Sequence, residues 1–274
     1  MTFQALIPLS GYAGWTFLTR TRESQQEVHD NSQLISREVE YFKENISKIS
    51  TAKELVKDRT LLKVALGAFG LDADLPNKAF VEKVLVEGSL LEDAFAHRLS
   101  DKRYLEMTVA FGFDLGTPRS KLSDFGDKIV KAYKGRQFEV AVGQANDSMR
   151  LALTVQRDLT DIANDDMTSN SKWFTVMGNP PLRSVFDTVF NLPSSFGALD
   201  LDRQLEVFQD RAERLFGSSD LTQFSDPEKQ EDLIQQFLVR SQLNSINIGV
   251  QSGRAALSLL QNSRSYFSNS QQFF

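Results

Sequence analysis

Two aspartates between predicted helices have the spacing that opens a calcium-binding loop. Asp72 and Asp74 stand at alternate positions, as the first carboxylates of such a loop do. The later positions do not fit, because the sixth is Asn77 where the turn requires Gly and the twelfth is Lys83 where a bidentate Glu is required. Acidic residues near the start of the next helix, where they favour the positive end of its dipole, explain this pair better. We therefore expect no metal here.

Nucleophilic chemistry is poorly supported by the residue types present. The pattern Ser-x-x-Lys, which begins a penicillin-binding-type site, occurs at Ser50–Lys53 and Ser169–Lys172, but the Lys-Thr-Gly triad that completes such a site is absent. The chain has no cysteine and two histidines, His29 and His97, so it has few groups suited to proton transfer at neutral pH. Glycine-rich phosphate loops and paired metal-binding histidines are also absent. We expect no catalytic residue, no cofactor and no metal site.

The composition indicates a folded protein without a nucleic-acid partner. The 274 residues are 41% hydrophobic and 24% charged, which is ordinary globular usage. The formal net charge of −5 argues against nucleic-acid binding, since phosphate recognition requires an excess of Lys and Arg. The chain has 21 Phe against 5 Tyr and 2 Trp, so most aromatic side chains lack a polar group and serve packing.

The first 21 residues form an apolar, nearly uncharged segment. Arg20 is its first formal charge, so the segment lacks the positive start of a secretory signal, and it lacks the long apolar run of a membrane span. We expect no cleavable secretory signal and no membrane-spanning segment. Residues 1–21 then form either a terminal arm packed on the body or an export and docking segment, with Trp15 and Phe17 as candidate contact residues.

Apolar residues recur every seven positions after Arg22. Val28, Ile35, Phe42 and Ile49 form one column, which predicts a long amphipathic helix with these four side chains buried along one face. Thr51 and Glu54 have the spacing of a capping box and predict a new helix there.

The middle of the chain repeats a helical-hairpin pattern over residues 54–88, 101–135 and, more faintly, 181–217. Five Phe-Gly dipeptides occur in the chain. We predict that Phe is the last core-facing residue of a helix at such a stop and that Gly closes the helix in the left-handed conformation, as at Gly70 and Gly112.

The last long helix is predicted to start at a capping box formed by Ser225 and Glu228, with Pro227 in its first turn. A narrow apolar seam then follows a heptad alternation at Leu243, Ile246, Val250, Leu257 and Leu260. Residues 265–274 form a polar tail. With no strand alternation, we predict an all-α protein: one helical domain over residues 22–264, with hairpins packed between a long N-terminal and a long C-terminal amphipathic helix.

Five blocks of the sequence resemble a bacterial family known as domain of unknown function 1217. They are Gly11–Trp15, Phe17–Thr21, Glu40–Asn45, Asp58–Asp72 and Leu99–Tyr104. The resemblance implies an all-helical protein with no established activity that is often encoded among flagellar genes. It supplies no catalytic or binding residues.

These observations favour a non-enzymatic structural, assembly or export-related protein of the bacterial flagellum that binds other proteins. The alternatives are a small-ligand-binding or regulatory helical module, or an enzyme with an unrecognised carboxylate site. The expected location is the bacterial cytoplasm or the flagellum. The oligomeric state stays open, as does the partner of the C-terminal seam, which is either the first heptad helix or another protein.

Overall fold

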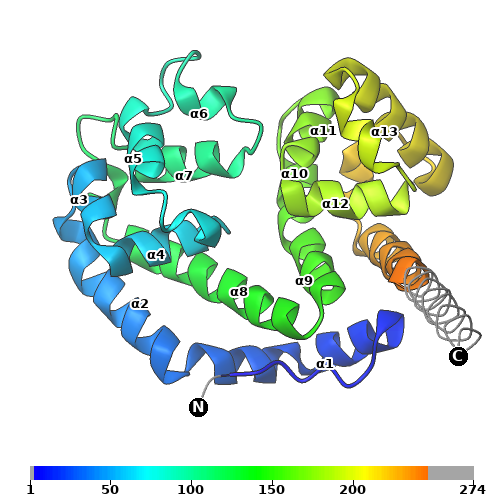
Figure 1. The fold of residues 1–274 in the computed structure, drawn as a ribbon, viewed down its shortest axis with the longest axis horizontal. Coiled ribbons are helices and arrows are strands. Elements are labelled where there is room, and N and C mark those ends of the chain that lie inside the picture. The colour runs from blue at the N-terminus through cyan, green and yellow to red at the C-terminus, as the bar shows by residue number, and fades with distance from the viewer. Residues whose placement is uncertain (1–2, 246–274) are drawn as a thin grey trace, which may run out of the picture.

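The computed structural model describes residues 3–245, and all regular structure in that range is helical, with no strand (Figure 1). The helices are α1 (Gly11–Asp30), α2 (Gln33–Asn45), α3 (Ala52–Lys57), α4 (Arg59–Ala68), α5 (Lys78–Glu87), α6 (Phe95–Arg98), α7 (Arg103–Phe111), α8 (Phe125–Ala145), α9 (Asp147–Thr154), α10 (Thr160–Asn164), α11 (Ser169–Met177), α12 (Pro180–Val189) and α13 (Leu201–Phe216). A π-helical turn, η4 (Val155–Leu159), joins α9 to α10. A last helix, called here the C-terminal helix, covers residues 227–245 of the described chain. The prediction of an all-α protein is confirmed.

The buried apolar side chains form two separate cores. The first core draws on residues from Ile35 to Tyr133, which lie on α2, α3, α4, α5, α7 and the first half of α8. Its helices start by local rules: Thr51 Oγ1 accepts a hydrogen bond from Glu54 N at 3.2 Å, and the Glu54 carboxylate accepts one from Thr51 N at 3.2 Å. The predicted capping box is therefore present.

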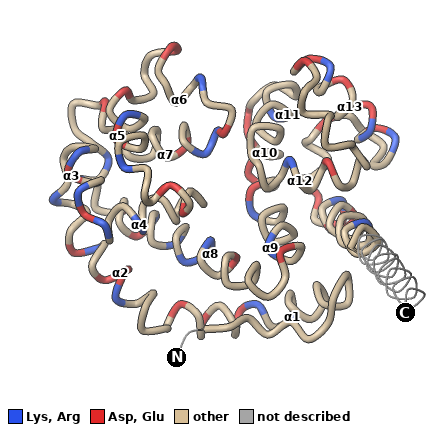
Figure 2. Tube along the Cα trace, in the orientation of Figure 1, with Lys and Arg blue, Asp and Glu red and all other residues tan. Residues whose placement is uncertain are grey.

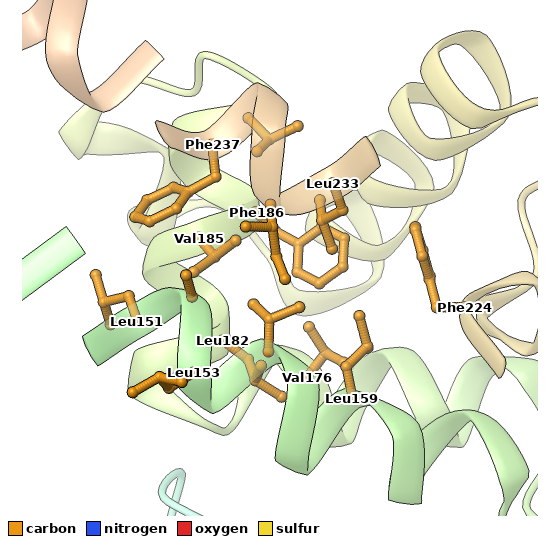
Figure 3. Packing of buried hydrophobic residues seen from close by; sticks show 14 of the residues in the cluster. Leu151, Leu153, Leu159, Val176, Leu182, Val185, Phe186, Phe224, Leu233 and Phe237 are labelled. Atoms are coloured by element: carbon orange, nitrogen blue, oxygen red, sulfur yellow. The ribbon is translucent and has the colours of Figure 1, made fainter. Parts of the chain in front are cut away.

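The second core contains α1, the end of α8, α9 to α13 and the C-terminal helix. Figure 3 shows Leu233 of the C-terminal helix beside the ring of Phe186 from α12, with Phe237 farther along the same helix in the same cluster. Phe208 of α13 is fully buried and lies 5.4 Å from Phe190, ring centre to ring centre, in an edge-to-face arrangement. Aromatic pairs of this geometry add to the free energy of burial.

Helix α8 belongs to both cores. Its first half contributes Ile129 and Tyr133 to the first core, and its second half contributes Phe138 and Val142 to the second. In Figure 1 it runs from beside α4 to the start of α9 and lies above α1. The two groups also meet at a second point, where Lys102 N donates a hydrogen bond to Gly178 O at 3.1 Å.

The N-terminal part of the chain differs from the expectation in two ways. α1 runs without interruption through residue 21, where we placed a boundary, and the heptad column is divided between α1 and α2 by a break at Asn31 and Ser32. The predicted single buried face is therefore wrong at Val28, which is 64% exposed, while Ile35 and Phe42 are buried and Ile49 is partly buried. The break changes the helix direction and turns α1 onto the second core, so the seven-residue spacing no longer describes one face.

The Phe-Gly dipeptides close helices in the left-handed conformation at Gly70 and Gly112, as predicted, and also at Gly217, but not at the other two positions. Gly70 and Gly112 have φ of +69° and +57°, in the left-handed region. The Phe125-Gly126 dipeptide instead begins α8, and Phe196-Gly197 lies in a short 3₁₀ segment. A Phe-Gly pair therefore marks a helix end only where the preceding residues already form an amphipathic helix.

The three ranges predicted as hairpins each contain two or more helices. Residues 54–88 include most of α3 with α4 and α5, residues 101–135 include α7 and the first half of α8, and residues 181–217 include most of α12 and all of α13. That these ranges repeat one helical-hairpin unit stays a prediction. The C-terminal helix starts one residue later than expected, because Asp226 rather than Ser225 caps it: the Asp226 carboxylate accepts a hydrogen bond from Glu228 N at 2.9 Å. The polar tail over residues 265–274 lies outside the described residues.

Within residues 3–245, no helix is both long enough and apolar enough to cross a membrane. The same residues contain no group of three or more His, Asp or Glu side chains placed to hold a metal ion. Asp74 instead accepts hydrogen bonds from Tyr104 and Asn77, and Asp72 accepts one from Gln137 at 2.7 Å.

Candidate functional site

The C-terminal helix has one buried face and one exposed apolar row. Leu233, Ile234 and Phe237 are 0–2% exposed and pack in the second core. Val239 and Leu243, which are four residues apart on the other side, are 46% and 55% exposed. Nothing in residues 3–245 covers these two side chains, and the helix is already anchored by its buried face, so they can contact another surface.

The structure separates the residues that we expected to form an interaction surface. Trp15 is 1% exposed, and its Nε1 donates to the Glu231 carboxylate at 3.0 and 3.2 Å. Phe17 is half-buried on α1. Trp15 therefore serves as an internal anchor that joins the first part of α1 to the C-terminal helix. Of the predicted seam, Leu243 is described and exposed; Ile246, Val250, Leu257 and Leu260 lie outside the described residues.

Leu243 lies at the edge of a groove of about 530 Å³ between α12, α13 and the C-terminal helix. We call it the arginine groove. It is lined by Thr188, Phe190, Asn191, Arg211, Arg214, Leu215, Arg240, Leu243 and Asn244.

Local sequence explains how α13 presents its side of the groove. Phe208, Ala212 and Phe216 are buried at a helical spacing of four, so they fix one face of α13 on the second core. Arg211 and Leu215 are also four apart and lie on the exposed side of the same helix. The groove therefore combines long basic side chains with a leucine on a rigid element.

The end of α12 completes the groove. The helix stops at Phe190, and Asn191 takes a left-handed conformation with φ of +52°. Asn191 N donates to Thr188 O at 3.2 Å, which closes the last turn. Asn and Asp tolerate this conformation better than other residues with a Cβ, and here it exposes the last turn of α12 to the groove.

The groove is positively charged. Arg214 pairs with Asp210 at 2.8 Å, whereas among residues 3–245 no carboxylate lies within 4 Å of the Arg211 or Arg240 guanidinium. Figure 2 shows basic segments both on α13 and on the C-terminal helix. Guanidinium groups around an apolar floor bind carboxylates and apolar side chains together, which is the chemistry of an acidic, amphipathic protein segment.

A second charged cluster lies inside the molecule, on η4. Arg157 donates to the Asp158 carboxylate at 2.7 and 3.1 Å and also pairs with Glu139 of α8. Burial alone would raise the pKa of Asp158, but the charges of Arg136 and Arg157 outweigh it and hold that pKa below its usual value. Burial raises the pKa of Glu139 against the same arginines. These groups pair their charges with one another, so the cluster holds α8 and η4 together.

The arginines of the groove were not predicted from the sequence. Arg211, Arg214 and Leu215 follow the 3-4 spacing of one helix face, and Arg240 precedes Leu243 by three residues. This spacing shows that each helix carries such a face. It does not show that α13 and the C-terminal helix bring the two faces together, since that depends on the second core.

A family model described as Protein of unknown function (DUF1217) matches residues 68–230. The chain belongs to this family. The DUF1217 match extends from the last residue of α4 into the C-terminal helix, so it includes α12 and α13 and ends before Arg240 and Leu243.

A solved structure has a similar fold. The X-ray crystal structure of Protein AGR_C_984 from Agrobacterium tumefaciens is 26% identical, with a TM-score of 0.71, over 88% of this chain and 99% of that chain. No curated protein matches the chain. The similarity extends across both cores and supports the arrangement of helices described above.

Proposed function

We propose that this protein is a non-enzymatic assembly factor that acts by binding other proteins through the arginine groove, and that it does so in the bacterial flagellum. The observation that carries the proposal is the exposed apolar row of the C-terminal helix, Val239 and Leu243, beside the arginines of the groove. The buried face of the same helix is already fully used in the second core. An apolar row flanked by arginines resembles the centre of a protein interface, where Arg and large apolar residues are enriched.

The chemistry of the groove supports binding over catalysis. Its lining contains three arginines, two amides, the hydroxyl of Thr188 and apolar side chains, and it contains no carboxylate or imidazole that could transfer a proton. The flagellar setting rests on the gene neighbourhood that the family resemblance implies.

A complementation experiment tests this proposal. The gene is deleted in its bacterium, and wild-type protein, Leu243→Asp or Leu201→Asp is supplied in its place. Leu201 is the matched control, because it is 54% exposed, belongs to the same half of the molecule and does not line the groove. We expect deletion to abolish swimming and Leu201→Asp to restore it, whereas Leu243→Asp fails to restore it while its circular dichroism and melting temperature match those of wild type. Normal swimming after deletion would rule out the flagellar role, and full rescue by Leu243→Asp would rule out the groove as the functional surface.

A further inference from the structure

The loop between α5 and α6 carries two adjacent leucines that no part of the described chain covers. Leu90 and Leu91 are 67% and 65% exposed, the highest values among the large hydrophobic side chains of residues 3–245. Glu92 and Asp93 follow directly and are exposed, and among the described residues neither has a cation within 4 Å. We call residues 90–93 the leucine tip.

The leucine tip is held in place at its base. The Asp114 carboxylate accepts hydrogen bonds from Ser89 N at 2.7 Å and Leu90 N at 3.1 Å. On the other side, Ala94 is buried, and its N donates to Leu91 O at 3.0 Å. A loop fixed at both ends presents its side chains with little entropy left to lose on binding. The tip is therefore suited to dock into another surface.

The leucine tip and the arginine groove are complementary. The tip offers two leucines and two unpaired carboxylates, and the groove offers an apolar floor with Arg211 and Arg240, which have no carboxylate partner in the described chain. Exposed charges of opposite sign steer association and favour pairing once water leaves the contact.

The two surfaces lie on different parts of the molecule. The tip is beside α6, in the helices of the first core, whereas the groove lies between α13 and the C-terminal helix, in the second (Figure 1). A tip therefore reaches a groove in another copy. Such a contact joins two different patches, so each bound pair leaves one free tip and one free groove, and further copies add head to tail.

We propose that the leucine tip of one copy docks in the arginine groove of a second copy, so that the protein assembles head to tail. The inference rests on the proposed function in one respect, since it names an occupant for the same groove.

Sedimentation velocity of the full chain at increasing concentration tests the proposal. A tip variant carries Leu90→Ser and Leu91→Ser, and a groove variant carries Arg211→Glu and Arg240→Glu. We expect wild type to associate with concentration, each variant alone to associate roughly tenfold more weakly or not at all, and added salt to weaken the wild-type contact. Leu201→Ser, an exposed control, should associate like wild type.

Mixing the two variants gives the decisive result. The tip variant keeps an intact groove and the groove variant keeps an intact tip, so a 1:1 mixture should form dimers and stop there. Circular dichroism checks that each variant is folded, and Arg211→Gln with Arg240→Gln replaces the groove variant if it is not.

A wild type that stays monomeric at its highest soluble concentration would overturn the proposal, as would a tip variant that associates like wild type or a mixture that stays monomeric. If self-association fails while Leu243→Asp still fails to restore swimming, the groove serves a different partner and the proposed function stands.

Discussion

The two cores differ in how far apart along the chain their members lie. The first core takes its residues from one continuous stretch, residues 35–133. The second joins Ala5, Trp15 and Leu18 to residues 138–238, so it is complete only when the N-terminal helix packs on the C-terminal part of the chain. Ordering such distant segments costs more chain entropy than ordering neighbours. The arginine groove lies on the surface of the second core, and its C-terminal helix is also the one that α1 contacts through Trp15.

Replacing Trp15 tests this difference most severely. Trp15→Ala removes a fully buried ring that ties α1 to the C-terminal helix and should lower the free energy of unfolding by about 3–5 kcal/mol. Trp15→Phe keeps most of the ring and loses the hydrogen bond to Glu231, so its cost should be nearer about 1–2 kcal/mol. Urea denaturation measures both losses.

Hydrogen exchange of the Trp15→Ala variant then shows where the stability is lost. We expect faster exchange in α9 to α13 and unchanged exchange in α3 to α5. An equal increase in both regions would mean that the two cores unfold as one unit, which would contradict the view that only the second core depends on α1.

Substitution of Arg157 in the charged cluster on η4 is expected to cause the next largest loss of stability. Arg157→Met removes the guanidinium that pairs with both Asp158 and Glu139 and leaves Arg136 as the remaining charge beside them, which should cost about 2–3 kcal/mol. The cost is below that of a fully enclosed pair because a quarter of the Arg157 side-chain surface stays accessible. Arg203→Met is the control: it breaks an exposed pair with Glu206 and should change the free energy of unfolding by less than about 1 kcal/mol. Equal losses of stability for the two substitutions in thermal denaturation would show that the Arg157 cluster stabilises the fold no more than a surface ion pair does.

Substitution of two glycines by Ala is expected to cause the smallest changes in stability, with opposite signs. Gly217 ends α13 with φ of +87° and has open space where a Cβ would lie, so Gly217→Ala should cost about 1 kcal/mol through backbone strain alone. Gly135 lies inside α8, also in open space, and Gly135→Ala should raise stability by about 0.5–1 kcal/mol. Differential scanning calorimetry would show whether Gly217→Ala melts lower and Gly135→Ala higher than wild type, and the same sign for both would contradict this explanation.

Local rules predicted the ends of several helices correctly. The capping box at Thr51 and the left-handed glycines at Gly70 and Gly112 depend on a few neighbouring residues, and the structure confirms them. The seven-residue column failed at Val28, because the break at Asn31 and Ser32 turns α1 away from α2, and spacing along the chain does not record that change of direction.

The candidate site was harder to predict than the helices. Apolar spacing alone does not distinguish Trp15, which faces the interior, from Leu243, which faces solvent, because both fit an amphipathic helix. The distinction depends on which neighbours cover each residue, and for Trp15 the neighbour is Glu231, 216 positions later. The arginine groove likewise forms only when α13 and the C-terminal helix are placed side by side.

Site-specific photo-crosslinking tests most directly whether the arginine groove is a protein-docking surface. A photoreactive phenylalanine analogue is placed at residue 243 or, as the matched control, at residue 201, and both proteins are irradiated in living cells. We predict a discrete crosslinked band for residue 243, identified by mass spectrometry as this protein or a flagellar component and lost when Arg211→Glu and Arg240→Glu are added. Equal crosslinking from residues 243 and 201, or none from residue 243, would contradict the docking role of the groove.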